Sequence, residues 1–287
     1  MKAAPVNIRL PWGTLEGLHW PRPGAAKVLC LHGWLDNAAS FVPLSPFLED
    51  FDLLALDFAG HGFSSHRPAT SRYYFPDNLY DVQAVLDVLG WDTCHIIGHS
   101  MGGGVASSFS AALPERVNRL VLLDSVGILT LPANQAAKQL RSSLQSVRKS
   151  RSILRPYDSI EDAMQARQEK SPLSDEAARL LCERSLEHTG DYYQWRTDPR
   201  LNWRSPQLLT DDQALDLLAA IRAPALVITS PSAIDYLGDE MLRKRLAAIA
   251  DCTHISNDGH HHFHMEQAEN TGKLITEFLQ EKHDDNS

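Results

Sequence analysis

Long apolar runs, paired cysteines and clusters of positive charge are all missing from this 287-residue sequence. No stretch approaches 18 uninterrupted apolar residues, and the first residues lack the apolar core of a secretion signal. The four cysteines lie far apart without C-x-x-C spacing, so we expect buried free thiols instead of disulfides. These absences predict a soluble, cytoplasmic protein with no membrane span.

The charge balance is acidic, with a formal net charge of −9. The densest basic run is Arg148-Lys149-Ser150-Arg151, which we interpret as the solvated face of a helix. Because nucleic acids and anionic membranes attract proteins through basic clusters, we expect neither as a partner. An apolar share of 43% is ordinary for a soluble globular enzyme.

Short apolar runs alternate with helical patterns along most of the chain. Residues 28–31 and 53–56 are nearly continuous apolar runs, which are typical of strands covered on both faces. Such alternation with short loops favours a parallel sheet between two layers of helices. The predicted class is α/β, with a mostly parallel sheet of about eight strands. We predict an edge hairpin over 6–20, strands at 94–97, 120–123, 225–228 and 253–256, and helices over 78–89, 101–113, 239–250 and up to about 280.

The pattern changes between residue 125 and about residue 210. This stretch is polar and helix-forming, with predicted helices at 133–149 and 174–186 and no apolar run that resembles a strand. We therefore expect a core domain of residues 1–125 and 211–287, with a helical subdomain of residues 126–210 inserted after the sixth strand. Residues 283–287 are expected to form a frayed tail.

A serine lies in a glycine-rich turn between a predicted strand and a predicted helix. The turn is Gly98-His99-Ser100-Met101-Gly102, and two more glycines follow it. Glycines two residues before and after the serine permit a sharp turn that lifts the hydroxyl off the sheet, where a base can reach it. This pattern is typical of a nucleophile elbow, so Ser100 is the candidate nucleophile.

Acyl transfer by a serine also needs a base, a carboxylate that orients the base, and donors for the oxyanion. His32-Gly33-Trp34 directly follows the predicted strand at 28–31, and the glycine lets the backbone turn the Trp34 N–H toward the reacting centre. Met101 begins the helix after the elbow, so its N–H gains from the helix dipole. We predict the backbone N–H groups of Trp34 and Met101 as the oxyanion donors.

Four histidines follow the last predicted strand, so spacing alone leaves the choice of base open. The loop is Asp258-Gly259-His260-His261-His262-Phe263-His264. Clustered histidines can also bind a metal, but adjacent residues point in different directions and no cysteine or paired carboxylate pattern completes a set. We expect no metal here, and we expect the other histidines to pack around the base.

These motifs resemble those of the α/β-hydrolase superfamily. The resemblance covers most of the chain and is carried by His32 to Ala38, Asp57 to Ser64, Gly98 to Gly103 and the late histidine loop. Within the superfamily, Pro11-Trp12-Gly13 and Ser64-Ser65-His66 are similar to the serine hydrolase-like family and its bacterial relatives. The resemblance implies an α/β-hydrolase fold with a cap formed by the inserted helices. The family's H-x-x-H-[LM]-E pattern implies His261 as the base, with His260 as the alternative.

The usual position of the acid departs from the family's pattern. Most members have a G-x-x-D turn after the seventh strand, but here Ser230 replaces the glycine and Ala233 replaces the aspartate. Asp124 ends the sixth strand with no shift in register, whereas Asp235 lies in the loop after the seventh strand. We favour Asp124 because strand-end geometry is better fixed than loop geometry, and Asp235 is the alternative acid.

The motifs predict a serine hydrolase that cleaves a carboxylic ester or thioester of a small to medium substrate through an acyl-enzyme. Such a triad requires no cofactor, and we expect none. A serine at the elbow, in place of aspartate, argues against the branches that form an alkyl-enzyme ester on a carboxylate. Two alternatives stay open: hydrolysis of a C–C bond by the same triad, and a non-catalytic protein that binds a ligand. The sequence contains no signal for the oligomeric state.

Overall fold

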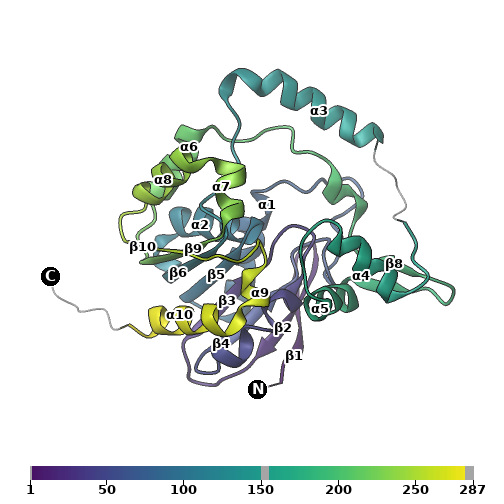
Figure 1. Ribbon diagram of the computed structural model, residues 1–287, viewed down its shortest axis with the longest axis horizontal. Helices are drawn as coiled ribbons and strands as arrows, with labels where there is room; N and C mark the ends of the chain where they lie inside the picture. The colour runs from purple at the N-terminus through teal and green to yellow at the C-terminus, as the bar shows by residue number, and fades with distance from the viewer. Residues whose placement is uncertain (1, 150–154, 282–287) are drawn as a thin grey trace.

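An eight-stranded sheet forms the centre of the molecule, with the strand order β1-β2-β4-β3-β5-β6-β9-β10 (Figure 1). The computed structural model describes residues 2–149 and 155–281, so the tail at 283–287 and residues 150 and 151 of the basic run lie outside the described residues. The hairpin β1-β2 pairs antiparallel with β4 at one edge, and all pairings from β4 to β10 are parallel. This confirms the predicted α/β class. The strands are β1 (Ala4–Leu10), β2 (Gly13–Trp20), β3 (Lys27–Leu31), β4 (Asp52–Leu56), β5 (Cys94–His99), β6 (Val117–Leu123), β9 (Ala225–Thr229) and β10 (Cys252–Ser256).

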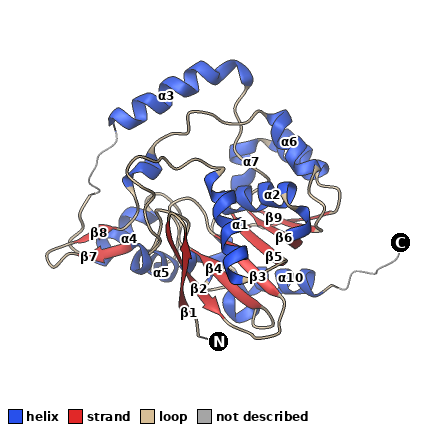
Figure 2. Cartoon of the chain, turned by 180° about the vertical axis from the view of Figure 1, so that it is seen from behind, coloured by secondary structure: helices blue, strands red, loops and turns tan. Residues whose placement is uncertain are grey.

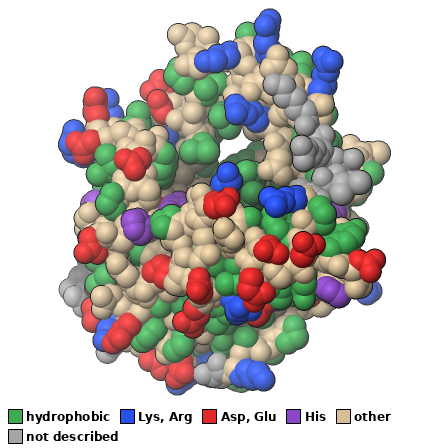
Figure 3. All heavy atoms as spheres, turned by 45° about the vertical axis from the view of Figure 1, so that its right-hand side comes forward, with side chains coloured by type: hydrophobic (Ala, Val, Ile, Leu, Met, Phe, Trp, Pro, Cys, Tyr) green, Lys and Arg blue, Asp and Glu red, His purple; other side chains and the backbone are tan. Residues whose placement is uncertain are grey.

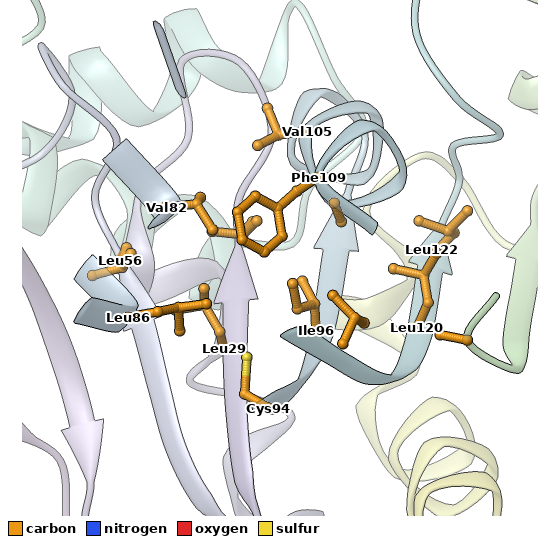
Figure 4. Packing of buried hydrophobic residues seen from close by; sticks show 14 of the residues in the cluster. Leu29, Leu56, Val82, Leu86, Cys94, Ile96, Val105, Phe109, Leu120 and Leu122 are labelled. Atoms are coloured by element: carbon orange, nitrogen blue, oxygen red, sulfur yellow. The ribbon is translucent and has the colours of Figure 1, made fainter. Parts of the chain in front are cut away.

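Helices cover both faces of the sheet, because neighbouring residues of a strand point to opposite sides. Leu29 of β3 packs in one buried cluster with Val105, and Val28 packs in the other with Ile275. Figure 4 shows the first of these clusters between the sheet and its helices. The first face is covered by α1 (Asp77–Leu89), α2 (Met101–Ala112), α6 (Asp211–Ala219) and α8 (Asp239–Ala248), and the second by α9 (Phe263–Glu266) and α10 (Ala268–Gln280).

An additional helix, α7 (Pro231–Leu237), follows β9 where the sequence predicted a loop. Ser230 is its N-cap and accepts a hydrogen bond from the Ser232 N–H, and Pro231 occupies the first turn. Proline is well suited to this position because its fixed φ is helical and its missing N–H would have no partner there. The Ser-Pro pair was therefore a helix-start signal. The predicted helix 239–250 ends earlier, at Ala248, because Ile249 is extended.

In its described residues, the inserted segment (residues 126–210) contains three α-helices, two short 3-10 helices and a short ribbon. In Figures 1 and 2, α3 (Ala136–Lys149) lies apart from the sheet as an outer arm, whereas α4 (Ile160–Gln168) and α5 (Asp175–Ser185) lie together beside the ribbon. The ribbon pairs β7 (Leu186–His188) with β8 (Tyr193–Trp195), so the prediction of no strand here was wrong. Its strands have three residues each, which is too short to produce a recognisable alternation.

Charge is unevenly distributed over the surface. Figure 3 shows Lys and Arg side chains gathered around an opening in the upper part of the molecule, with Asp and Glu side chains across the body below it. Lys138, Arg141 and Arg148 of α3 are exposed. The acidic net charge is therefore concentrated away from this arm.

All four cysteines are free, as predicted. Three are buried, but Cys252 is only half-buried because it begins the edge strand β10, so the prediction of burial was wrong there. Among the described helices, none is long and apolar enough to cross a membrane.

Candidate active site

Ser100 lies in a sharp turn between β5 and α2. Its φ of 52° is in the left-handed region, which a serine adopts only when its surroundings hold it there. Its N–H donates to the Leu123 carbonyl at 3.0 Å, which fixes the turn against β6. A Cβ on Gly98 would lie 2.5 Å from the Gly102 carbonyl oxygen, and one on Gly102 would lie 2.0 Å from that of Leu31. Both glycines are therefore required for the turn.

His261 contacts Ser100 from the loop after β10. The His261 Nε2 atom lies 2.9 Å from the Ser100 Oγ, and its Nδ1 atom lies 2.6 Å from Asp124 Oδ2. A carboxylate only accepts, so Nδ1–H donates to Asp124, and Nε2 is free to accept the Ser100 proton. His260, the alternative base, is exposed.

Asp124 directly follows β6 and is completely buried. Its Oδ1 accepts from the Ser230 N–H at 2.6 Å, and its Oδ2 accepts from the Ser232 hydroxyl at 2.7 Å. Burial would raise the pKa of this carboxyl, but the hydrogen bonds from His261, Ser232 and Ser230 together hold the pKa below its usual 3.8. The carboxylate is therefore ionised and fully partnered beside the imidazole.

Asp235, the alternative acid, lies on α7 and is exposed. Among the described residues, its carboxylate makes no hydrogen bond or ion pair with His261. The helix that begins at Pro231 carries Asp235 away, and it brings Ser232 to Asp124 instead. Sequence reasoning missed the two serines that support Asp124, although the helix-start signal at Ser230 could have revealed them.

The two predicted oxyanion donors come from the elbow itself and from the loop after β3. Met101 is the first residue of α2, so its N–H has no acceptor within the helix. Trp34 is in the loop after β3, where Asp36 N–H donates to the Gly33 carbonyl at 3.1 Å and forms a tight turn. Within the described residues, neither the Trp34 N–H nor the Met101 N–H donates to a protein acceptor. Both donors are therefore available to a ligand.

Three non-glycine residues among the described ones have a positive φ, and all three lie in this region. They are Ser100, Asp124 and Leu35, with φ values of 52°, 48° and 63°. Backbone strain of this kind persists only where surrounding contacts determine the conformation, and it often occurs at functional sites. Leu35 directly follows Trp34, so the strain occurs at the candidate nucleophile, the candidate acid and the predicted oxyanion loop.

One group near the site has residue types that can hold a metal ion. Asp36, His99 and His262 are buried, and their ligand atoms lie within 4.8 Å of one another. The Arg167 guanidinium already pairs with the Asp36 carboxylate. Because a second cation would be repelled by this guanidinium, we assign no metal to the group.

Comparisons with known proteins identify the family of this chain. A family model described as the alpha/beta hydrolase fold matches residues 27–260. The serine hydrolase-like protein of Danio rerio is 33% identical over 97% of this chain and 89% of its own length. The relative named serine hydrolase-like protein from Dictyostelium discoideum is also 33% identical, over 92% of this chain and 77% of its own. The chain therefore belongs to the α/β-hydrolase superfamily and, within it, to the serine hydrolase-like family.

Solved structures are similar over almost the whole chain. A hypothetical protein from Pseudomonas aeruginosa PAO1 is 34% identical, with a TM-score of 0.89 over 98% of this chain and 100% of the other. The thioesterase domain from the curacin biosynthetic pathway is 21% identical, with a TM-score of 0.83 over 96% of this chain and 100% of the domain. The second likeness concerns the fold alone.

Proposed function

We propose that this protein is a serine hydrolase that cleaves a carboxylic ester or thioester through an acyl-enzyme. The observation that carries the proposal is the continuous contact from Asp124 to His261 to Ser100, at 2.6 and 2.9 Å. Nucleophile, base and acid come from the ends of three strands, as in other serine hydrolases of this fold.

In the first step, Ser100 Oγ attacks the carbonyl carbon while His261 Nε2 takes the hydroxyl proton. The oxyanion that forms is stabilised by the Trp34 and Met101 N–H groups. His261 then gives the proton to the departing alcohol or thiol, and the acyl group remains on Ser100. Water then attacks the acyl-enzyme through the same two proton transfers, which releases the carboxylic acid product and restores Ser100. Asp124 stays ionised and stabilises the imidazolium in both steps.

We further propose that the inserted segment (residues 126–210) acts as a cap that shapes the substrate site. Exposed aromatic side chains near the proposed triad support a substrate with an apolar group. Trp34 is 50% exposed in the oxyanion loop, and Tyr236 of α7 is 45% exposed beside Asp124. Exposed aromatic surface next to polar catalytic groups is typical of ligand sites.

The sequence left two other functions open. Hydrolysis of a C–C bond can proceed on the same triad, and only substrate tests separate it from ester cleavage. A non-catalytic role was suggested by the missing aspartate after the seventh strand. The Asp124 contact to His261 supplies a carboxylate from β6 and removes the reason for that alternative.

Labelling with a fluorophosphonate probe tests the proposed function. We expect the folded chain to label, and Ser100→Ala to remain unlabelled while its circular dichroism spectrum is unchanged. A series of p-nitrophenyl esters of increasing chain length then measures substrate preference. A folded wild-type chain that takes no label, or that labels no faster than Ser100→Ala, would contradict the proposal.

A further inference from the structure

One buried carboxylate outside the triad lies where four elements meet. Asp36 is 2% exposed and lies in the oxyanion loop, two residues after Trp34. Its Oδ2 lies 3.2 Å from His262 Nε2 and 3.6 Å from His99 Nδ1. Its Oδ1 accepts a hydrogen bond from Arg167 of α4, in the inserted segment.

The two histidine partners are sequence neighbours of residues in the proposed mechanism. His99 directly precedes Ser100, and His262 directly follows His261. Since adjacent residues share a peptide unit, a shift of either imidazole moves the nucleophile or the base. Asp36 therefore contacts the residues beside Ser100 and His261, and it lies in the same loop as Trp34.

Arg167 also holds the strained part of the oxyanion loop. Its Nη1 donates to the Leu35 carbonyl at 3.1 Å, and Leu35 is the residue with a φ of 63°. One guanidinium thus contacts both the backbone after Trp34 and the Asp36 carboxylate. The arrangement requires glycine at position 33, because a Cβ there would lie 2.9 Å from Asp36 Oδ2 and 3.0 Å from His99 Nδ1.

Because His99 is neutral, the Asp36 carboxylate depends on Arg167 and on its contact with His262 Nε2. His99 Nε2–H donates to the His261 carbonyl at 2.8 Å, which leaves Nδ1 with a lone pair and no hydrogen-bond partner among the described residues. Burial lowers the pKa of His99 to about 4, so the ring is neutral at pH 7. A lone pair and a carboxylate therefore face each other at 3.6 Å. Arg167 supplies the positive charge that keeps Asp36 in place.

We propose that Asp36 is a positioning residue that transmits the docking of the inserted segment, through Arg167, to the alignment of Trp34, Ser100 and His261. This inference rests on the proposed hydrolase function. It predicts that breaking the contact slows the chemical step more than it weakens substrate binding, because the reacting groups lose alignment while the substrate surface remains.

A second buried ion pair provides a matched control. Arg184 of α5 donates to both carboxylate oxygens of Asp57 at 3.0 Å, and Asp57 is completely buried. Asp57 accepts from the backbone N–H groups of Ala38 and Phe63. Among the described residues it makes no hydrogen bond to the elbow or to the histidine loop. Arg184 thus joins the same segment to the core without contacting His99 or His262, the residues beside Ser100 and His261.

The experiment measures kcat and KM of the full chain on a p-nitrophenyl ester, with the melting temperature measured in parallel. For Arg167→Met and for Asp36→Asn, we expect kcat to fall by about 10- to 100-fold while KM changes by less than about threefold. Arg167→Lys keeps the charge, so its kcat should be about tenfold higher than that of Arg167→Met. Arg184→Met should lower the melting temperature as Arg167→Met does, with kcat within about threefold of wild type.

A double variant tests whether the two residues act through one contact. If they do, Asp36→Asn combined with Arg167→Met lowers kcat no further than the more severe single variant. Should Asp36→Asn fail to fold, Arg167→Met and its lysine rescue still decide the question.

Three results would overturn the inference. The first is an equal loss of kcat in Arg167→Met and Arg184→Met, which would indicate a general effect of segment packing. The second is wild-type kcat in folded Asp36→Asn. The third is loss of wild-type activity in EDTA with recovery in Zn²⁺, which would make the cluster a metal site. Failure of the proposed function is a separate result, because it appears as an unlabelled wild-type chain.

Discussion

At the scale of single residues, the hydrogen-bond partners favour Asp124 as the acid of the proposed triad. The Asp124 carboxylate contacts His261 and accepts from Ser230 and Ser232, whereas Asp235 is exposed on α7. A carboxylate that orients an imidazole must hold its tautomer, and only a fixed, buried group can do so.

Asp124→Asn is expected to lower kcat on an ester substrate by about 10³- to 10⁴-fold, because an amide can leave the imidazole in the wrong tautomer. Asp235→Asn is the matched control, and we expect its kcat to stay within about twofold of wild type, as for other surface changes. Steady-state kinetics of both variants at pH 7.5 measure the difference. A larger loss in Asp235→Asn would reverse the assignment.

At the scale of elements, the contact between α2 and the end of β3 depends on a missing side chain. A Cβ on Gly102 would lie 2.0 Å from the Leu31 carbonyl oxygen, which is backbone and cannot turn aside. Two positions in the first turn of this helix tolerate glycine replacement differently, since a Cβ on Gly104 would lie 3.3 Å from its nearest neighbour, the Gly127 carbonyl oxygen.

Gly102→Ala should therefore destabilise the fold by about 3 kcal/mol or more, through forced separation of the helix and the strand. Gly104→Ala should change the free energy of unfolding by no more than about 1 kcal/mol, because alanine also favours helix. Urea unfolding followed by circular dichroism measures both values. Equal stabilities of the two variants would contradict this account of the elbow.

At the scale of the whole molecule, the inserted segment is joined to the core by buried charge pairs. Arg167 pairs with Asp36, and Arg184 pairs with Asp57. Removing one member of a buried pair leaves a charge without compensation, which is costly. Helices α4 and α5 are therefore held in a defined position against the core.

Buried neutral histidines predict how stability depends on pH. Burial lowers the pKa of His32 and His99 to about 4 and that of His61 to about 3. Unfolding returns these groups toward 6.5, so between pH 6.5 and about 4 the unfolded chain binds more protons than the folded one. Stability therefore falls as the pH falls through this window, by about 1 kcal/mol per pH unit for each imidazole.

Melting temperatures measured between pH 7.5 and pH 4.5 test this expectation. We expect a steady decrease below pH 6.5 and little change above it. A melting temperature that stays constant from pH 7 to pH 5 would show that these imidazoles are not neutral and buried.

Much of the fold followed from local patterns. Continuous apolar runs predicted the central strands, and the helix predicted over 78–89 does end at Leu89, where Gly90 follows with a φ of 64°. The errors occurred where local signals were short or ambiguous. The β7-β8 ribbon has too few residues to show alternation, and α7 begins at a proline that was interpreted as a loop.

The sequence by itself determined the elbow, the parallel sheet and the candidate nucleophile Ser100, because glycine spacing and apolar periodicity are local properties. The candidate base His261 was implied by the resemblance to the family. Only the tertiary structure could decide which carboxylate reaches the imidazole, since Asp124 and His261 are 137 residues apart and meet through strand order. The same holds for Asp36 and Arg167, which are 131 residues apart. Contacts between distant residues depend on how elements pack, and no local pattern records that packing.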